Sequence, residues 1–423
     1  MIRRVKIQKY KSLKDVELHL RPISILVGPN ASGKSNLLDA LSLLSLSATQ
    51  KNLSEAFKEH RGQPLETAYY NNDSNLNKNY DDITFEVDIE LTQTVIDTVT
   101  NRIQQMRTPY EKDTKTQQKK YIYEHFMRYQ ISLRIDRKSG FIGVSKEMAC
   151  AMRQDWSSPK SGRKAFIESD ENHGKIYLRM EGQSHPTHFD IGLDHSILST
   201  SFYEPHHPHL AALREELSRW KVFYFEPREL MREYNPIMDT SVIGSRGEYL
   251  ASFYNSLKHK NPSQFKSIGH SLRQIIPDIY NIEVTPLPEG QVILEVQEIG
   301  GKRSARLISE GTLRLLGLAA IINSASVLSV IGYEEPENGV HPRRISLVAK
   351  WLKNAAANKN TQWIITTHSP QLAKEFDNQD LFVCSKDDSG SHFQQFVAPG
   401  ELYRDLNIAS SFEERLMRGD FGG

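Results

Sequence analysis

Hydrophobic and polar residues alternate in several stretches near the start of the chain. The alternation predicts strands over residues 2–10, 15–20 and 83–91. Residues 23–27 form a short apolar run, ISILV, which is typical of a buried strand. Immediately beyond the next glycine-rich stretch, a helical stripe of apolar residues is predicted at positions 37, 38, 41 and 44. The first ninety residues therefore combine strands with at least one helix.

The middle of the chain has a weaker pattern. We predict a surface loop over residues 47–82, a helix over 92–105, a solvated polar segment over 111–120, and a helix followed by a strand over 121–135. A basic run at Lys160, Arg163 and Lys164 indicates either an exposed loop or a nucleic-acid contact.

Six histidines occur between positions 185 and 209, which is compatible with a metal site or with a proline-containing loop. Their spacing matches no standard zinc pattern, and nearby prolines interrupt any helix that could align ligands. Asp194 and His195 match only the beginning of a His-Asn-His nuclease motif.

The periodic pattern returns in the second half. Within residues 221–230, a buried strand is predicted that runs into the polar segment 226–229. Helices are predicted over 247–259 and 262–276, and a hairpin over 282–296. Ser309 is a typical N-cap for a further helix, and two apolar strands are expected at 327–333 and from 363.

Composition narrows the class of protein. The chain has 423 residues, of which 38% are hydrophobic, and a formal net charge of +1. Any nucleic-acid contact must therefore come from a local patch or a partner. Two cysteines exclude a disulfide scaffold and a four-cysteine zinc site. No apolar stretch of ~18 residues occurs, so we expect a cytoplasmic protein without membrane contact.

The residues with the clearest chemistry are 28–35, GPNASGKS, which fit the phosphate-binding pattern G-x-x-x-x-G-K-[ST] between a predicted strand and helix. Glycines allow the backbone to approach phosphates, while Lys34 can reach the β and γ phosphates and Ser35 can bind Mg²⁺. We expect ATP to contact the loop and the start of the helix at Asn30, Ala31, Ser32, Gly33, Lys34, Ser35 and Asn36.

Three later segments could complete such a site. Ser309, Gly311 and Thr312 lie at a helix start, which indicates either a second anion site or only a capped helix. Glu334 and Glu335 end an apolar strand, where one carboxylate could hold Mg²⁺ and the next orient water, unless they form a charged turn. His368 ends another strand and is either a phosphate contact or a structural histidine.

In this order the segments resemble the ABC-type ATPases of the SMC, RecF and OLD group, and within it the short predicted ATPases described as AAA-family. The resemblance implies that residues 28–35 are Walker A, 309–312 the signature motif and 338–342 the D-loop. It also implies that Glu334 is the Walker B metal ligand, that Glu335 and His368 are catalytic, and that Glu226 is a further metal contact. Walker B usually has aspartate at position 334, and Glu-Gly-Thr replaces the Gly-Gly-Gln of transporter signatures, which argues against a transporter.

The implied fold is an α/β P-loop NTPase of the ABC-type ATPase-head class, with a mixed β-sheet flanked by helices and an inserted α+β or helical region. We divide it into residues 1–92, an insertion at 93–220 that serves as a partner surface, and 221–423. The implied activity is Mg²⁺-dependent ATP hydrolysis in a homodimer or higher oligomer, with ATP sandwiched between Walker A of one copy and the signature of another.

About 40 residues follow the last expected strand of the ATPase, too few for a separate nuclease domain. We therefore expect a separately encoded nuclease or effector, as in bacterial antiviral systems such as Septu and PARIS, which the chain resembles. The alternatives are a RecF- or SMC-like repair ATPase that binds DNA directly, and a small-molecule P-loop kinase. The effector, the trigger, the oligomer number and the glutamine-loop equivalent stay open.

Overall fold

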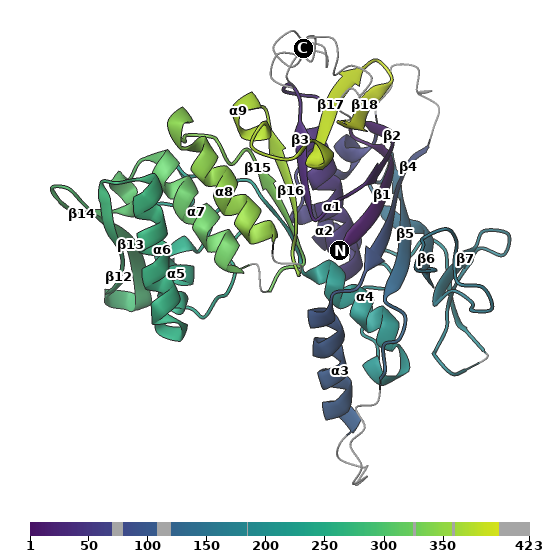
Figure 1. Ribbon diagram of the computed structural model, residues 1–423. Helices are drawn as coiled ribbons and strands as arrows, with labels where there is room; N and C mark the ends of the chain where they lie inside the picture. Colours follow the sequence, from purple (N-terminus) through teal and green to yellow (C-terminus); the bar gives the residue numbers. More distant parts are fainter. Residues whose placement is uncertain (70–78, 108–119, 184, 325–326, 358–359, 397–423) are drawn as a thin grey trace. The chain divides into compact units, whose positions relative to one another are not determined.

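The computed structural model describes residues 1–69, 79–107, 120–183, 185–324, 327–357 and 360–396. The chain forms two compact units, each assembled from segments that are distant in sequence (Figure 1). The first unit comprises residues 1–21, 31–220 and 384–393, and the second comprises 22–30, 221–383 and 394–423. The three-part division by sequence stays a prediction.

The first unit is built on an eight-stranded antiparallel sheet. In spatial order its strands are β2 (Leu13–His19), β1 (Ile2–Tyr10), β4 (Tyr80–Glu90), β5 (Phe126–Asp136), β6 (Ile142–Ala151), β7 (Ile167–Asp170), β8 (Lys175–Leu178) and β9 (Thr187–Asp190). Its helices are α1 (Lys34–Thr49), α2 (Leu53–Lys58), α3 (Gln93–Arg107) and α4 (Pro208–Ser218), with 3₁₀ turns at Pro64–Thr67 and Glu204–His206.

The two faces of this sheet differ in character. Alternate residues of β4 and β5 are fully buried apolar side chains, among them Phe85 and Ile131. The residues between them point to the other face and form ion pairs across the strands. Arg128 Nε lies 2.6 Å from Asp88 Oδ1, and Arg134 Nε lies 2.9 Å from Asp82 Oδ1. The period of two in the sequence therefore separates a hydrophobic core from a face of ion pairs.

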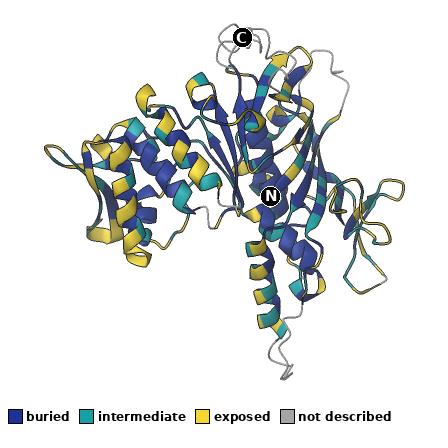
Figure 2. Cartoon of the chain, in the orientation of Figure 1, coloured by how far each residue is buried: buried dark blue, intermediate teal, exposed yellow. Residues whose placement is uncertain are grey.

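The second unit contributes most of a six-stranded sheet in the order β10 (Trp220–Phe223), β15 (Val330–Glu334), β16 (Gln362–Thr367), β3 (Ile23–Val27), β17 (Leu381–Asp387) and β18 (Gly390–Gln395). Residues 384–387 of β17 and 390–393 of β18 are counted with the first unit. β15, β16, β3 and β17 pair in parallel. Their residues form near-continuous apolar runs because both faces of a parallel sheet are covered, and Figure 2 shows these strands largely buried.

Among the described residues of the second unit, a smaller antiparallel sheet and five helices complete the fold. Its strands are β11 (Asn235–Pro236), β12 (Ile279–Leu287), β13 (Gln291–Glu298) and β14 (Gly301–Ser304). The helices are α5 (Leu250–Lys260), α6 (Pro262–Ile275), α7 (Glu310–Ser324), α8 (Ile345–Ala356) and α9 (Pro370–Ala373). Short 3₁₀ turns occur at Pro288–Gly290, Ala305–Leu307, Pro342–Arg344 and Asn378–Asp380.

Several local predictions are confirmed. The strand at residues 23–27 has the predicted bounds, and the 282–296 hairpin turns at 288–290 as expected. The helices predicted near 92–105, 247–259 and 262–276 are α3, α5 and α6. The mixed α/β character predicted for the chain is also present.

Two local predictions are wrong. Residues 47–82 are not simply a surface loop, because α1 continues to Thr49 and α2 follows, with Asn52 accepting a hydrogen bond from the Glu55 N–H at 2.9 Å. Residues 121–125 are not helical, because the Tyr123 and Glu124 N–H groups donate to His209 Nε2 instead. The polar segment predicted at 111–120 lies almost wholly outside the described residues.

The histidine-rich stretch is structural where it is buried. His209 is fully buried, its Nδ1 lies 2.7 Å from Glu181, and its Nε2 accepts the two backbone N–H groups. In the described part of the chain, no group of three or more His, Cys, Asp or Glu side chains is arranged to hold a metal. None of the described helices has the length and apolar character that a membrane span requires.

Candidate functional site

The Walker A segment follows β3 and leads into α1. Two of its residues have left-handed backbone, Ala31 at φ 64° and Gly33 at φ 100°. A side chain at Gly33 would also collide with its surroundings, since an added Cβ would lie 2.2 Å from Ser391 Oγ and 2.9 Å from Ser12 Oγ. Glycine at position 33 is therefore required by both conformation and space.

The start of α1 is held by side chains from two other segments. Asn36 Nδ2 donates to Ser12 Oγ at 2.8 Å, and Ser12 Oγ lies 2.6 Å from Ser391 Oγ. These contacts connect the helix to the β1–β2 turn and to β18. Ser12 and Ser391 carry no nucleotide motif, so sequence reasoning did not identify them.

The N-terminus of α1 fits an anion. Gly33 is its N-cap residue and offers no side-chain acceptor to the first N–H groups of the helix. Lys34 is buried, and its Nζ lies 3.4 Å from Ser32 Oγ. Amide dipoles and a lysine at one helix start are suited to phosphate oxygens.

Chemistry-bearing residues gather at the carboxyl edge of the parallel sheet in the second unit. Val27 pairs with Thr367, so Gly28 and His368 follow directly after neighbouring strands. Glu334 pairs with Thr366 on the other side of β16. Parallel strands place their carboxyl ends at one edge of a sheet, where α/β proteins bind ligands.

Glu335 and His368 lie next to each other at this edge. His368 Nδ1 is 3.3 Å from Glu335 Oε1, and both side chains are partly exposed. The Glu335 N–H donates to the Thr366 carbonyl at 3.0 Å, which joins the turn after β15 to β16. A carboxylate beside an imidazole can orient a water molecule and accept a proton from it.

The backbone at Glu335 is left-handed, with φ 47°. This conformation is unfavourable for a residue with a Cβ and is held here by the turn, in which the Asn338 N–H donates to the Glu335 carbonyl at 3.1 Å. Asn338 Nδ2 also donates to Glu335 Oε2. The turn therefore sets the direction in which the Glu335 side chain leaves the backbone, and Asn338 holds one of its carboxylate oxygens.

The predicted N-cap of α7 is confirmed. Ser309 Oγ accepts the Thr312 N–H at 3.2 Å and lies 2.9 Å from Thr312 Oγ1. Ser309 is nevertheless exposed, whereas Thr312 is buried. The helix start is thus fixed by its own cap while its outer face stays accessible.

The signature segment and the D-loop segment touch through two glycines. A Cβ added at Gly311 would lie 2.0 Å from the Gly339 carbonyl oxygen, and Gly339 has φ 74°. This close contact ties the start of α7 to the turn that carries Glu335. The sequence contains the two glycines but gives no sign that they meet.

An ion pair lies beside this contact. Arg228 Nε donates to Glu310 Oε1 at 2.6 Å, and this contact holds the pKa of the Glu310 carboxyl below its ordinary value. Arg232 Nη2 donates to the Ile308 carbonyl at 3.0 Å. Sequence reasoning assigned Glu226 of this segment to metal contact and missed the connection of Arg228 and Arg232 to the signature helix.

The assignment of metal ligands stays a prediction. Glu226 Oε2 lies 3.7 Å from Arg246 Nη1, and the preceding Phe225 ring packs 5.3 Å from the ring of Tyr333, next to Glu334. Ser35 belongs to the first unit and Glu334 to the second. The small number of acidic residues suits Mg²⁺, which takes one or two carboxylates together with phosphate oxygens and water.

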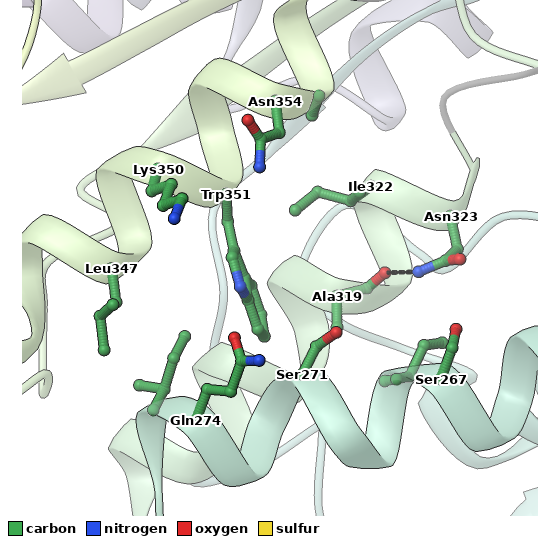
Figure 3. A pocket seen from close by; sticks show the side chains of 13 residues that line it. Ser267, Ser271, Gln274, Ala319, Ile322, Asn323, Leu347, Lys350, Trp351 and Asn354 are labelled. Atoms are coloured by element: carbon green, nitrogen blue, oxygen red, sulfur yellow. Dashed lines mark hydrogen bonds between the residues drawn. The ribbon is translucent and has the colours of Figure 1, made fainter.

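A separate groove of about 410 Å³ lies between α6, α7 and α8. Figure 3 shows the Trp351 indole extending from α8 into it, with Gln274 and Ser271 of α6 opposite. None of the nucleotide-motif residues lines this groove. It is therefore distinct from the sheet edge that carries Glu335 and His368.

A protein-family model described as "AAA ATPase domain" matches residues 1–373. The chain belongs to this AAA ATPase family. The match spans the Walker A, signature and Walker B segments and ends just after His368. No curated protein matches the sequence.

Solved structures similar to this AAA ATPase are SMC head domains. An SMC head bound to the C-winged helix domain of ScpA is 14% identical, with a TM-score of 0.53, and the alignment covers 93% of this chain and 97% of that one. The SMC head domain from Thermotoga maritima is 11% identical, with a TM-score of 0.41 and coverage of 93% and 98%. One from Pyrococcus furiosus is 13% identical, with a TM-score of 0.48 and coverage of 93% and 95%.

The first of these similarities indicates a shared fold. The AAA ATPase is therefore of the P-loop, SMC-head-like type, as predicted from the motifs.

Proposed function

We propose that this AAA ATPase binds ATP with Mg²⁺ and hydrolyses it at a composite site formed by two copies of the chain. Residues 30–36 hold the phosphates, Ser35 and Glu334 hold the metal with Glu226 as a further contact, and Glu335 activates the attacking water beside His368. The observation that carries the proposal is the Glu335–His368 pair, 3.3 Å apart at the carboxyl edge of the sheet whose strand β3 leads into Walker A.

Mg²⁺, held by Ser35 and Glu334, would neutralise charge on the phosphates. The chain's own contribution is positional. Asn338 holds one oxygen of Glu335, and the other faces the imidazole of His368, so the carboxylate can accept a proton from water without moving.

The second copy would contribute the signature segment. Leu307, just before α7, is 72% exposed, and Ser309 is exposed as well. An exposed large apolar residue beside an accessible helix N-terminus supports a role in covering the γ-phosphate of another copy, where helix dipoles stabilise negative charge.

The test is the exchange of Ser309 for arginine. S309R should retain ATP binding, lose ATP-induced dimers, and hydrolyse ATP at least about 100-fold more slowly, because the arginine obstructs the shared site. Ser263→Arg is the matched control, since Ser263 is an exposed serine in the first turn of α6. Normal turnover by S309R would overturn the two-copy site.

We further propose that the ATPase regulates or scaffolds a separately encoded effector, a nuclease in the antiviral systems that it resembles. The similar SMC head was solved with a domain of a partner protein, which supports partner binding by this type of head. Co-purification of the ATPase with the product of a neighbouring nuclease gene would test this role.

Direct DNA binding, as in a RecF- or SMC-like repair ATPase, is the competing function. The resemblance of the sequence motifs to that group supports it, whereas the net charge of +1 does not. A gel shift by the isolated protein that weakens steeply with salt would decide for DNA, and its absence would favour the effector.

A further inference from the structure

The turn after β15 carries a third carboxyl group, Glu337, which none of the motif assignments uses. Its side chain is 6% exposed. Oε1 accepts hydrogen bonds from Thr367 Oγ1 at 2.5 Å and from the His368 N–H at 3.3 Å. Oε2 is buried and has no hydrogen-bond partner among the described residues.

This pattern of contacts is unfavourable for an ionised carboxylate. Both charged oxygens would need donors, and a buried oxygen without one costs desolvation free energy. Burial accordingly raises the pKa of the Glu337 carboxyl above its ordinary value. A protonated Glu337 would bury no charge, so protonation lowers the cost of the unpaired Oε2 while Oε1 keeps both of its hydrogen bonds.

The imidazole of His368 faces both carboxyl groups of the turn. Its Nδ1 lies 3.3 Å from Glu335 Oε1 and 3.7 Å from Glu337 Oε1. An ionised Glu337 would compete with Glu335 for the same Nδ1 proton. Tyr333 of β15 is a further neighbouring group, and burial raises the pKa of its phenol, which stays neutral. The charge of Arg314 of α7 opposes this rise in the pKa of Tyr333.

We propose that Glu337 is a positioning residue of the ATPase site, a buried acid that binds the Thr367 hydroxyl and the His368 N–H and leaves the His368 imidazole to Glu335. The inference rests on the proposed roles of Glu335 and His368. Glu337 touches no reacting atom; it holds the end of β16 so that the imidazole stays within reach of the carboxylate that activates water.

The experiment compares Glu337→Ala with Glu337→Gln. The alanine variant leaves the Thr367 hydroxyl and the His368 N–H without an acceptor, so kcat should fall about 10- to 100-fold through misplacement of the histidine, with the KM for ATP within about twofold of the parent. Glutamine keeps a neutral acceptor at Oε1 and should restore kcat to within about threefold. Thermal melting of each variant shows whether it is folded.

Thr367→Val is the second test should the alanine variant not fold. Valine preserves the shape of a fully buried side chain and removes the hydroxyl that donates to Glu337. We expect a lower kcat at an unchanged KM. An unchanged kcat in T367V, or in folded E337A, would overturn the proposal.

Glutamine as slow as alanine would also overturn it, because the site would then need an ionisable acid rather than a neutral acceptor. Glu335→Gln, measured in parallel, separates this inference from the function on which it rests. If E335Q retains full turnover, the proposed active site is wrong; if E335Q is inactive while E337A is unaffected, only the role of Glu337 is wrong.

Discussion

The antiparallel sheet of the first unit and the parallel sheet of the second use charged residues in different ways. In β4 and β5, carboxylates lie within the strands and pair with arginines of the neighbouring strand, as Asp88 does with Arg128. In β15 of the parallel sheet, the strand interior is apolar, and the carboxylates lie at the last paired residue, Glu334, and just after it, at Glu335.

The difference follows from how the strands are connected. An antiparallel sheet with one covered face offers alternate positions for ion pairs that stabilise the fold. A parallel sheet covered on both faces leaves polar chemistry to the loops at its carboxyl edge. Carboxylates of the first kind should affect stability, and those of the second kind should affect turnover.

The largest expected effect is on turnover. Glu335→Gln should lower kcat about 1,000-fold and accumulate ATP-bound closed dimers, because the amide cannot accept a proton from water. Steady-state hydrolysis and size-exclusion chromatography with ATP measure both effects. Glu289→Gln is the matched control, since Glu289 is an exposed glutamate that also has left-handed backbone, at φ 70°. Rapid turnover by E335Q would remove the contrast between the two sheets.

The next effect is on stability. Asp88 is 1% exposed and is bound by Arg128 Nε at 2.6 Å and Nη2 at 2.8 Å. Asp88→Ala should lower the free energy of unfolding by about 4 kcal/mol, because the arginine loses its buried partner. Asp82→Ala, at the more exposed pair with Arg134, should cost about 1 kcal/mol or less. Denaturant titration measures both losses, and turnover per folded molecule should not change in either variant.

A smaller effect than that of Asp88→Ala is a dependence of stability on pH in the antiparallel sheet. Glu147 is fully buried, and burial raises its pKa from 4.5 to about 7 despite hydrogen bonds from Tyr129 and the Ile197 and Leu198 N–H groups. The unfolded chain releases this proton near pH 4.5 and the folded chain near 7, so the folded state binds more protons between these values. Its contribution to stability is complete below pH 4.5 and falls as the pH rises to 7, by about 3 kcal/mol in total.

Glu147→Gln removes the titrating group and should flatten this part of the stability profile. Unfolding midpoints measured at half-unit steps from pH 4.5 to 7.5 provide the comparison. A profile for E147Q that falls as steeply as that of the parent would assign the pH dependence to another group.

The strand-ending motifs of the parallel sheet were predictable from sequence because each occupies a contiguous stretch. The strand before Walker A, the Ser309 cap and the apolar runs before Glu335 and His368 depend on local periodicity and local hydrogen bonds. The α2 helix was missed because its Asn52 cap lies in a polar stretch that resembles a loop.

By itself the sequence determined the order of the nucleotide motifs, the strands and helices that hold them, and membership in a P-loop ATPase class. The tertiary structure decided which residues support those motifs. Ser12 and Ser391 lie close to Gly33, and Gly339 lies close to Gly311. Glu337 accepts hydrogen bonds from Thr367 and His368. These contacts join segments that are distant in the chain or lie in different turns. Residue types and spacing record what each segment prefers locally, whereas a contact between segments exists only once packing has brought their backbones together.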